Sequence, residues 1–74
     1  MKTTIRAKAG EFKFATWAKS KEYIFKYKNY NLKCEILDEE MKLFSYDYIL
    51  LLDGEKSDID AYLSFLRIKG FSIK

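Results

Sequence analysis

The sequence contains no histidine and no proline, and it has one cysteine and three glycines among its 74 residues. Histidine is the side chain that most often performs acid and base catalysis near neutral pH, so its absence argues against an enzyme. The lone Cys34 cannot close a disulfide within the chain, which suits a reducing compartment. We therefore expect a protein that has no catalytic activity and holds no metal or cofactor.

Long hydrophobic runs are missing as well. The longest spans Tyr48 to Leu52, which is five residues, whereas a helix needs about 20 residues to cross a membrane. The first ten residues are polar and basic, so they do not have the pattern of a secretory signal peptide. We expect a cytoplasmic protein with no membrane partner.

The chain does contain enough apolar surface for one small core. Hydrophobic residues make up 49% of the sequence and aromatic residues 18%, and this composition separates it from disordered chains. A chain of this length buries only about 60% of the surface that its unfolded form exposes. The composition predicts a single globular domain over residues 1–74 with modest stability.

The net charge of +3 hides an uneven distribution of charge along the chain. Residues 1–33 hold nine basic and two acidic side chains, giving +7, whereas residues 34–74 hold five basic and nine acidic side chains, giving −4. The chain therefore has a basic first half and an acidic second half, so a partner of either charge would meet a defined region.

The last third of the sequence has the clearest pattern, a helix followed by a short strand. Apolar residues recur at helical spacing within Asp58–Lys69. Ser57 and Asp60 have the spacing of a capping box, and Gly70 stands where a left-handed C-terminal cap belongs. Apolar and polar residues then alternate over 71–74, which predicts a strand.

Over residues 43–53, every second side chain is apolar, which is the pattern of a strand with one buried face. We expect this row to face the core, and its members are Phe44, Tyr46, Tyr48, Leu50 and Leu52. The opposite row places Ile49 and Leu51 between polar residues. These two side chains would form an apolar patch on an otherwise wet face.

Two more segments, residues 3–9 and 32–36, show the same alternation. Cys34 lies on the apolar row of the second segment, which predicts a buried small side chain rather than a reactive thiol. The acidic run Asp38–Glu40 predicts the hairpin turn between this strand and the next.

Residues 11–29 predict an amphipathic helix whose apolar residues are Phe14, Trp17, Ala18, Ile24 and Phe25. Lys21 fills the missing turn of this stripe, and its long side chain can reach out to solvent. The element order is then strand, helix, strand, strand, helix, strand. This order predicts a ferredoxin-like βαββαβ fold of the α+β class, with a four-stranded antiparallel sheet, two helices on one face and the other face open.

The end of the chain resembles the end of a NIL or ACT-like regulatory domain. The matching segments are 48–55, where an apolar strand ends in an acidic residue and glycine, the acidic-started helix 58–66, and 70–73. Gly10 and Asn31 match the glycine and asparagine of ACT domains at the corresponding places. The resemblance implies a small regulatory or ligand-sensing module that pairs its sheet with a copy of itself and catalyses nothing.

Three functions follow from these patterns. The first is a protein-interaction module that self-associates as a homodimer, or binds another protein, through Ile49 and Leu51 on its open sheet face. The second is a nucleic-acid-binding protein that contacts phosphates through Arg6, Lys8, Lys19, Lys21, Lys26 and Lys28. The third is an ACT-like sensor that binds a small ligand at a loop containing Gly10 and Asn31.

Overall fold

The computed structural model describes residues 1–10 and 17–74. In chain order its elements are the strand β1 (Lys2–Gly10), the helix α1 (Trp17–Ile24), the 3-10 helix η1 (Phe25–Asn29), the strands β2 (Leu32–Lys42) and β3 (Ser45–Gly54), the helix α2 (Lys56–Lys69) and the strand β4 (Phe71–Ile73).

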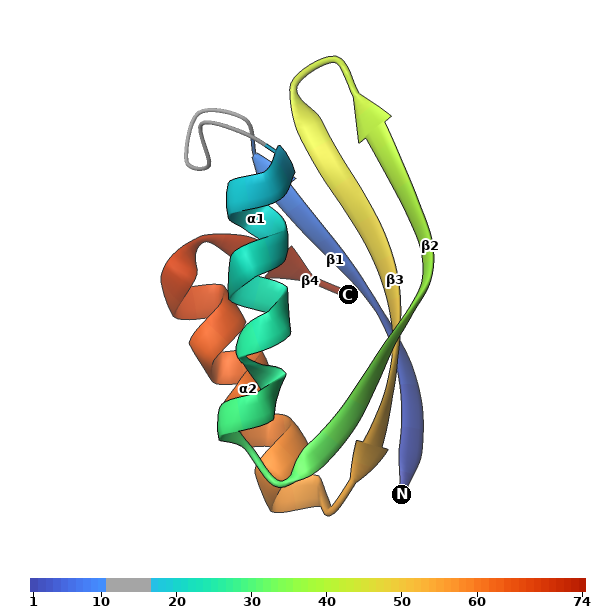
Figure 1. The fold of residues 1–74 in the computed structure, drawn as a ribbon, viewed down its shortest axis with the longest axis vertical. Helices are drawn as coiled ribbons and strands as arrows, with labels where there is room; N and C mark the ends of the chain where they lie inside the picture. Colours follow the sequence, from blue (N-terminus) through green and yellow to red (C-terminus); the bar gives the residue numbers. More distant parts are fainter. Residues whose placement is uncertain (11–16) are drawn as a thin grey trace.

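The strands form one sheet in the order β2-β3-β1-β4, and each strand is antiparallel to its neighbours. It follows that β1 and β2 run parallel with β3 between them, and that β3 and β4 run parallel with β1 between them. Both helices cover the same face of the sheet (Figure 1). The predicted α+β class, with a four-stranded antiparallel sheet and two helices, is therefore confirmed.

The core lies between the sheet and the two helices, and alternation along the strands decides which of their side chains enter it. The buried residues on β1 and β3 are Ile5, Ala7, Ala9, Tyr48, Leu50 and Leu52, and those on α2 are Ile59, Tyr62 and Leu66. The predicted inward row of β3 is confirmed for its last three members, and Tyr46 is half-buried. Phe44 lies in the turn before β3 and is 59% exposed, so its assignment to the core was wrong.

The acidic run does not form the hairpin turn, because β2 continues through Asp38–Glu40 as far as Lys42 and the turn falls at 43–44. A β-bulge lies between Ile36 and Asp38, leaving Leu37 without a partner on β3. A bulge adds one residue to a strand and so exchanges the faces of all that follow. Asp38 consequently pairs with Ile49, on the face away from the helices.

The first helical segment is only partly the amphipathic helix expected for residues 11–29. Phe14 and the start of that prediction lie outside the described residues. Ala18 and Phe25 are exposed, whereas Ser20 and Ile24 are buried. The apolar stripe predicted from spacing was therefore wrong at two positions, because a serine hydroxyl takes a core position that the pattern gave to carbon side chains.

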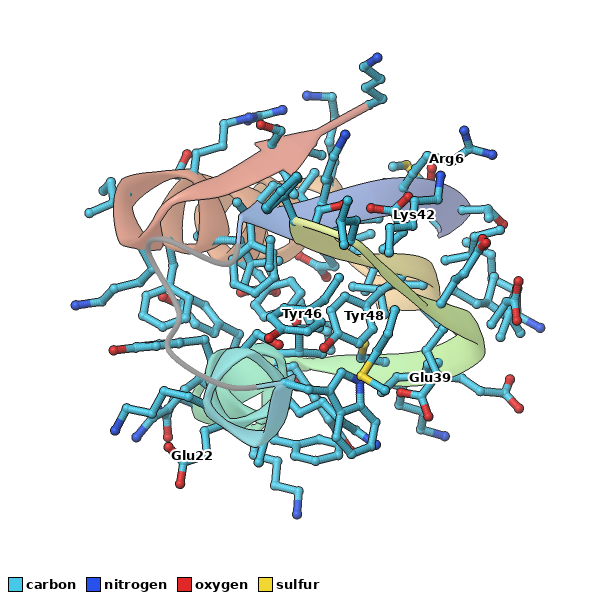
Figure 2. The ribbon with its side chains drawn as sticks, turned by 90° about the horizontal axis from the view of Figure 1, so that it is seen from above. Arg6, Glu22, Glu39, Lys42, Tyr46 and Tyr48 are labelled. Carbon is cyan, nitrogen blue, oxygen red and sulfur yellow. The ribbon has the colours of Figure 1, made fainter. Side chains whose placement is uncertain are left out.

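Two buried hydroxyl networks attach α1 to the rest of the molecule. Ser20 Oγ donates to the Trp17 carbonyl oxygen at 2.7 Å and lies 2.6 Å from the Tyr48 hydroxyl on β3. The Tyr62 hydroxyl on α2 donates to the Ile24 carbonyl oxygen at 2.7 Å. Figure 2 shows Tyr48 directed toward α1. Burial raises the pKa of Tyr48, so its hydroxyl stays protonated and donates to Ser20.

Helix α2 begins at Lys56, two residues before the predicted start, and the expected capping box is absent. Glu55 is the N-cap and makes no side-chain cap hydrogen bond, while Asp60 instead accepts a hydrogen bond from Lys56 Nζ at 2.8 Å. The predicted C-terminal cap is confirmed. Gly70 has φ of 115°, and its N–H donates to the Leu66 and Arg67 carbonyl oxygens at 3.1 Å.

Replacing Gly70 by alanine will destabilise the fold, since a Cβ at this positive φ is strained. We expect the free energy of unfolding to fall by about 1–2 kcal/mol, measured by urea denaturation. Gly10→Ala is the matched control, because a Cβ there meets no atom within 4 Å. Equal losses in the two variants would contradict the assignment of Gly70 as a left-handed cap.

The hydroxyl pair of Ser20 and Tyr48 will show energetic coupling in a double-mutant cycle. Ser20→Ala leaves the buried Tyr48 hydroxyl without its partner, and we expect a loss of about 1–3 kcal/mol in the free energy of unfolding. Ser20→Ala made in a Tyr48→Phe background should cost at least about 0.5 kcal/mol less than it does alone. Strictly additive losses would show that the two hydroxyls do not interact.

Candidate functional site

The sheet face away from the helices, called the open face from here on, has an apolar centre with opposite charges on its two sides. By strand, its side chains are Lys33, Glu35, Asp38, Glu40 and Lys42 on β2; Asp47, Ile49, Leu51 and Asp53 on β3; Lys2, Thr4, Arg6 and Lys8 on β1; and Ser72 on β4, followed by Lys74. Carboxylates thus dominate the middle of β2, while cations dominate β1 and the end of the chain.

The central pair of the open face, Ile49 and Leu51, is half-buried. Both residues lie on the face predicted for them, opposite Arg6 and Thr4 of β1. They are less exposed than an uncovered apolar patch would be. The apolar area that solvent can reach is therefore narrow, and charge must contribute to whatever this face recognises.

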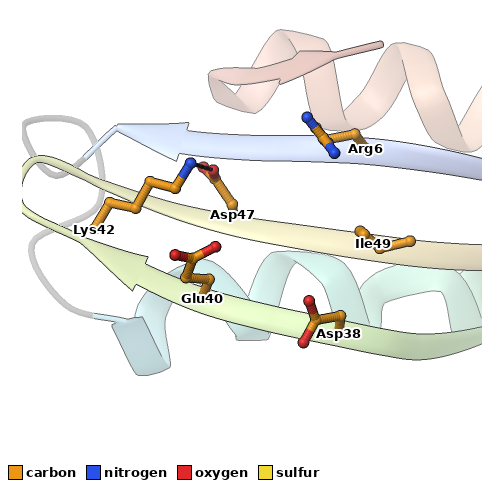
Figure 3. Close-up of a pocket in the computed structure, with 6 residues that line it drawn as sticks. All are labelled: Arg6, Asp38, Glu40, Lys42, Asp47 and Ile49. Carbon is orange, nitrogen blue, oxygen red and sulfur yellow. Dashed lines mark ion pairs between the residues drawn. The ribbon is translucent and has the colours of Figure 1, made fainter.

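A shallow hollow of about 110 Å³ lies on the open face, lined by Arg6, Asp38, Glu40, Lys42, Asp47 and Ile49. Figure 3 shows Arg6 on one side of β3 and the carboxylates of Asp38 and Glu40 on the other. Lys42 Nζ lies 2.9 Å from Asp47 Oδ2, and this hydrogen bond raises the pKa of Lys42. The remaining charges of the hollow stay available to a partner.

The cations of β1 and the carboxylates of β2 do not pair with one another. No salt bridge among the described residues includes Arg6, Lys8 or the two β2 carboxylates that line the hollow. β3 separates the two strands, and two strand spacings amount to about 9–10 Å. The open face therefore presents separated and unpaired charges of both signs.

The six basic residues expected to contact a nucleic acid do not share one surface. Arg6 and Lys8 lie on the open face, whereas the other four lie on the helical layer at the opposite side of the sheet: Lys19, Lys21, Lys26 and Lys28. This division leaves no continuous basic surface that includes all six.

Two of the lysines on the helical layer are already paired with carboxylates. Lys19 lies 3.4 Å from Glu22, and Lys21 lies 3.4 Å from Glu39. Lys21 Nζ also lies 4.3 Å from the centre of the Trp17 ring, a cation–π contact. Lys21 thus lies along apolar surface as expected, but its ammonium group is paired with Glu39 instead of reaching out to solvent.

Gly10 and Asn31, expected to form one ligand loop, lie at opposite ends of the sheet. Gly10 pairs with Ser45 at the start of β3, while Asn31 precedes Leu32, which pairs with Gly54 at the end of β3. Nine residues of a strand span about 30 Å. The two residues therefore do not share a pocket within one chain.

Several open-face residues were missed in the sequence because Asp38–Glu40 was assigned to a turn. The signal that could have found them is the absence of glycine, asparagine and proline from Ile36 to Phe44, since those residues mark most tight turns. A run of nine residues without them favours a strand that continues. No sequence signal marks the bulge at Leu37 itself.

Comparison of the chain with protein-family models, curated proteins and solved structures gives no match. None of the described helices is both long enough and apolar enough to span a membrane. Within residues 1–10 and 17–74, no three side chains of the cysteine or carboxylate type gather closely enough to hold a metal ion.

Cys34 lies half-buried on the helix side of β2 and will react slowly. Burial raises the pKa of its thiol from 9.0 to about 11, so the folded protein holds only about one thiolate per thousand chains at pH 8. We expect alkylation by iodoacetamide at pH 8 to be about 100-fold slower in the folded protein than in urea. Equal rates in the two conditions would contradict this placement, and Cys34→Ala supplies the background rate.

Proposed function

We propose that this chain is a non-catalytic, ferredoxin-like interaction module that self-associates through its open face. The ferredoxin-like assignment is supported by the strand order, which reads β4-β1-β3-β2 from the other edge. Each helical segment joins two parallel strands that have one other strand between them, and both helices lie on one face of the sheet. These are the connections of a split βαβ unit used twice.

The observation that carries the proposal is the open face itself. It combines the half-buried pair Ile49 and Leu51 with cations and carboxylates that form no salt bridge among the described residues. Solvated surfaces ordinarily carry charges of both signs, but here the two signs are sorted onto two separate strands with an apolar pair between them. A second copy of the chain supplies both signs at once and covers the apolar pair.

The size of the open face sets the strength of this association. The Cα framework measures 34 × 20 × 18 Å, so one whole face offers roughly 700 Å². Stable complexes commonly bury about 800 Å² on each partner. We therefore expect a weak and reversible dimer, with a dissociation constant in the micromolar range and a dependence on salt concentration.

The resemblance to NIL and ACT-like domains remains a prediction alongside this proposal, since it implies the same kind of sheet-to-sheet pairing. Binding of a small ligand within one chain receives no support from the positions of Gly10 and Asn31. Nucleic-acid binding also stays a prediction, and its basic residues are divided between two surfaces.

Leu51→Asp will abolish self-association, because the new carboxylate would be buried without a partner at the centre of the interface. Sedimentation equilibrium of the unaltered protein over about 5–500 µM should fit a monomer–dimer equilibrium, and the variant should weaken it at least about tenfold. Ile68→Asp is the matched control, since Ile68 is 81% exposed on α2. A protein that is monomeric over the whole range, or a dimer indifferent to Leu51→Asp, would refute the proposal.

A further inference from the structure

We infer that two copies pack open face against open face about a two-fold axis parallel to β3, so that Asp38 and Glu40 of each copy meet Arg6 and Lys8 of the other. This inference rests on the proposed self-association and adds its orientation and its charge pairs. The kind of partner that the open face fits is thus a second copy of the chain in one defined arrangement.

The register of the sheet places the charges in rows across the open face. One row contains Asp38 on β2, Ile49 on β3 and Arg6 on β1. The next contains Glu40, Asp47 and Lys8 on the same three strands. In both rows β3 lies midway between a carboxylate and a cation, so the charge pattern changes sign across β3.

A half-turn about an axis along β3 places the carboxylates of these two rows opposite the cations of the second copy. It keeps each residue in its row and lays β2 of one copy over β1 of the other. Asp38 then lies over Arg6 of the second copy, and Ile49 and Leu51 lie over their own counterparts. Packed sheets stand about 10 Å apart, a separation that facing side chains fill and that arginine and lysine can span. Apolar contacts form at the centre, and ion pairs form on both sides in the rows of Asp38 and Glu40. Like charges face one another at the end of the sheet, where Lys33 lies over Lys2 and Asp53 over its own counterpart.

A half-turn about an axis across the strands gives the opposite result. Each strand then lies over its own counterpart with the rows reversed. With the axis between the rows of Ile49 and Leu51, three facings are of like charge: Glu35 with Asp38, Lys2 with Lys8, and Asp47 with Asp53. One facing, Glu40 with Lys33, is of opposite charge. Like charges facing one another destabilise an interface. A two-fold axis in the plane of the sheet can run along the strands or across them, and the charge pattern favours the axis along β3.

The pairs proposed between copies do not compete with pairs inside one chain. Lys42 is already held by Asp47 at 2.9 Å, so Asp47 can face its own counterpart with part of its charge neutralised. In the rows of Asp38 and Glu40, the rotation brings together the charges on β1 and β2 that have no ion-pair partner among the described residues. Among the described residues, no ion pair within one chain includes Arg6, Asp38 or Glu40, and the rotation gives each of them a partner of opposite charge.

Charge-swap variants test this orientation. Arg6→Glu with Lys8→Glu, and separately Asp38→Lys with Glu40→Lys, should each weaken dimerisation at least about tenfold in sedimentation equilibrium. The variant carrying all four changes has the unaltered net charge of +3, and it should dimerise within about threefold of the unaltered protein. Its β2 cations again face β1 carboxylates. With an axis across the strands, by contrast, Arg6→Glu with Lys8→Glu would remove the repulsion between Lys2 and Lys8 and strengthen the dimer, so the loss expected in this double variant distinguishes the two axes.

The control is Lys26→Glu with Lys28→Glu, which changes net charge by the same amount on the helical layer and should leave the dimer unchanged. Circular dichroism shows whether each variant is folded. If the fourfold variant does not fold, Arg6→Glu with Asp38→Lys exchanges the charges of a single row and tests the same rescue. A dimer that is lost in Leu51→Asp but is not rescued by either folded swap overturns the orientation and leaves the proposed function standing. An unaltered protein that never dimerises overturns both.

Discussion

Two buried tyrosine hydroxyls hold the short helix α1 against the sheet and α2, and the rest of the arrangement depends on them. Eight residues of helix bury too little surface to hold a position by packing alone. Tyr48 reaches α1 from β3 through Ser20, and Tyr62 reaches its last carbonyl, on Ile24, from α2. Since burial keeps both hydroxyls protonated, these contacts fix both helices on one face and leave the other face open.

The open face is charged because a small α+β domain has one core layer only. With Tyr48, Leu50 and Leu52 turned toward the helices, the alternate residues of β3 must face solvent or a partner. The sheet order then puts β3 between a strand rich in carboxylates and a strand rich in cations. Separation by a whole strand prevents these charges from neutralising one another, which is why the same surface can be both well solvated alone and complementary to its own copy.

Those features of the fold and of the open face that follow a periodic pattern could be predicted from the sequence. The inward rows of β1 and β3, the apolar side of α2 and the cap at Gly70 follow from alternation, helical spacing and the steric freedom of glycine. The bulge at Leu37 and the core position of Ser20 do not, because each depends on a partner far away in the chain. The strand containing Ile49 and Leu51 was accordingly predictable, while the face on which the neighbouring carboxylates lie was not, because the bulge sets it.

The bulge therefore has a larger effect on function than its single residue suggests. Without it, Asp38 and Glu40 would share the face of Ile36 and point at the helices, and Leu37 and Glu39 would lie on the open face. With it, Glu39 turns toward Lys21 on α1 and both other carboxylates turn outward. One inserted residue thus gives the helical layer an ion pair and completes the charge pattern on which the proposed pairing of two copies depends.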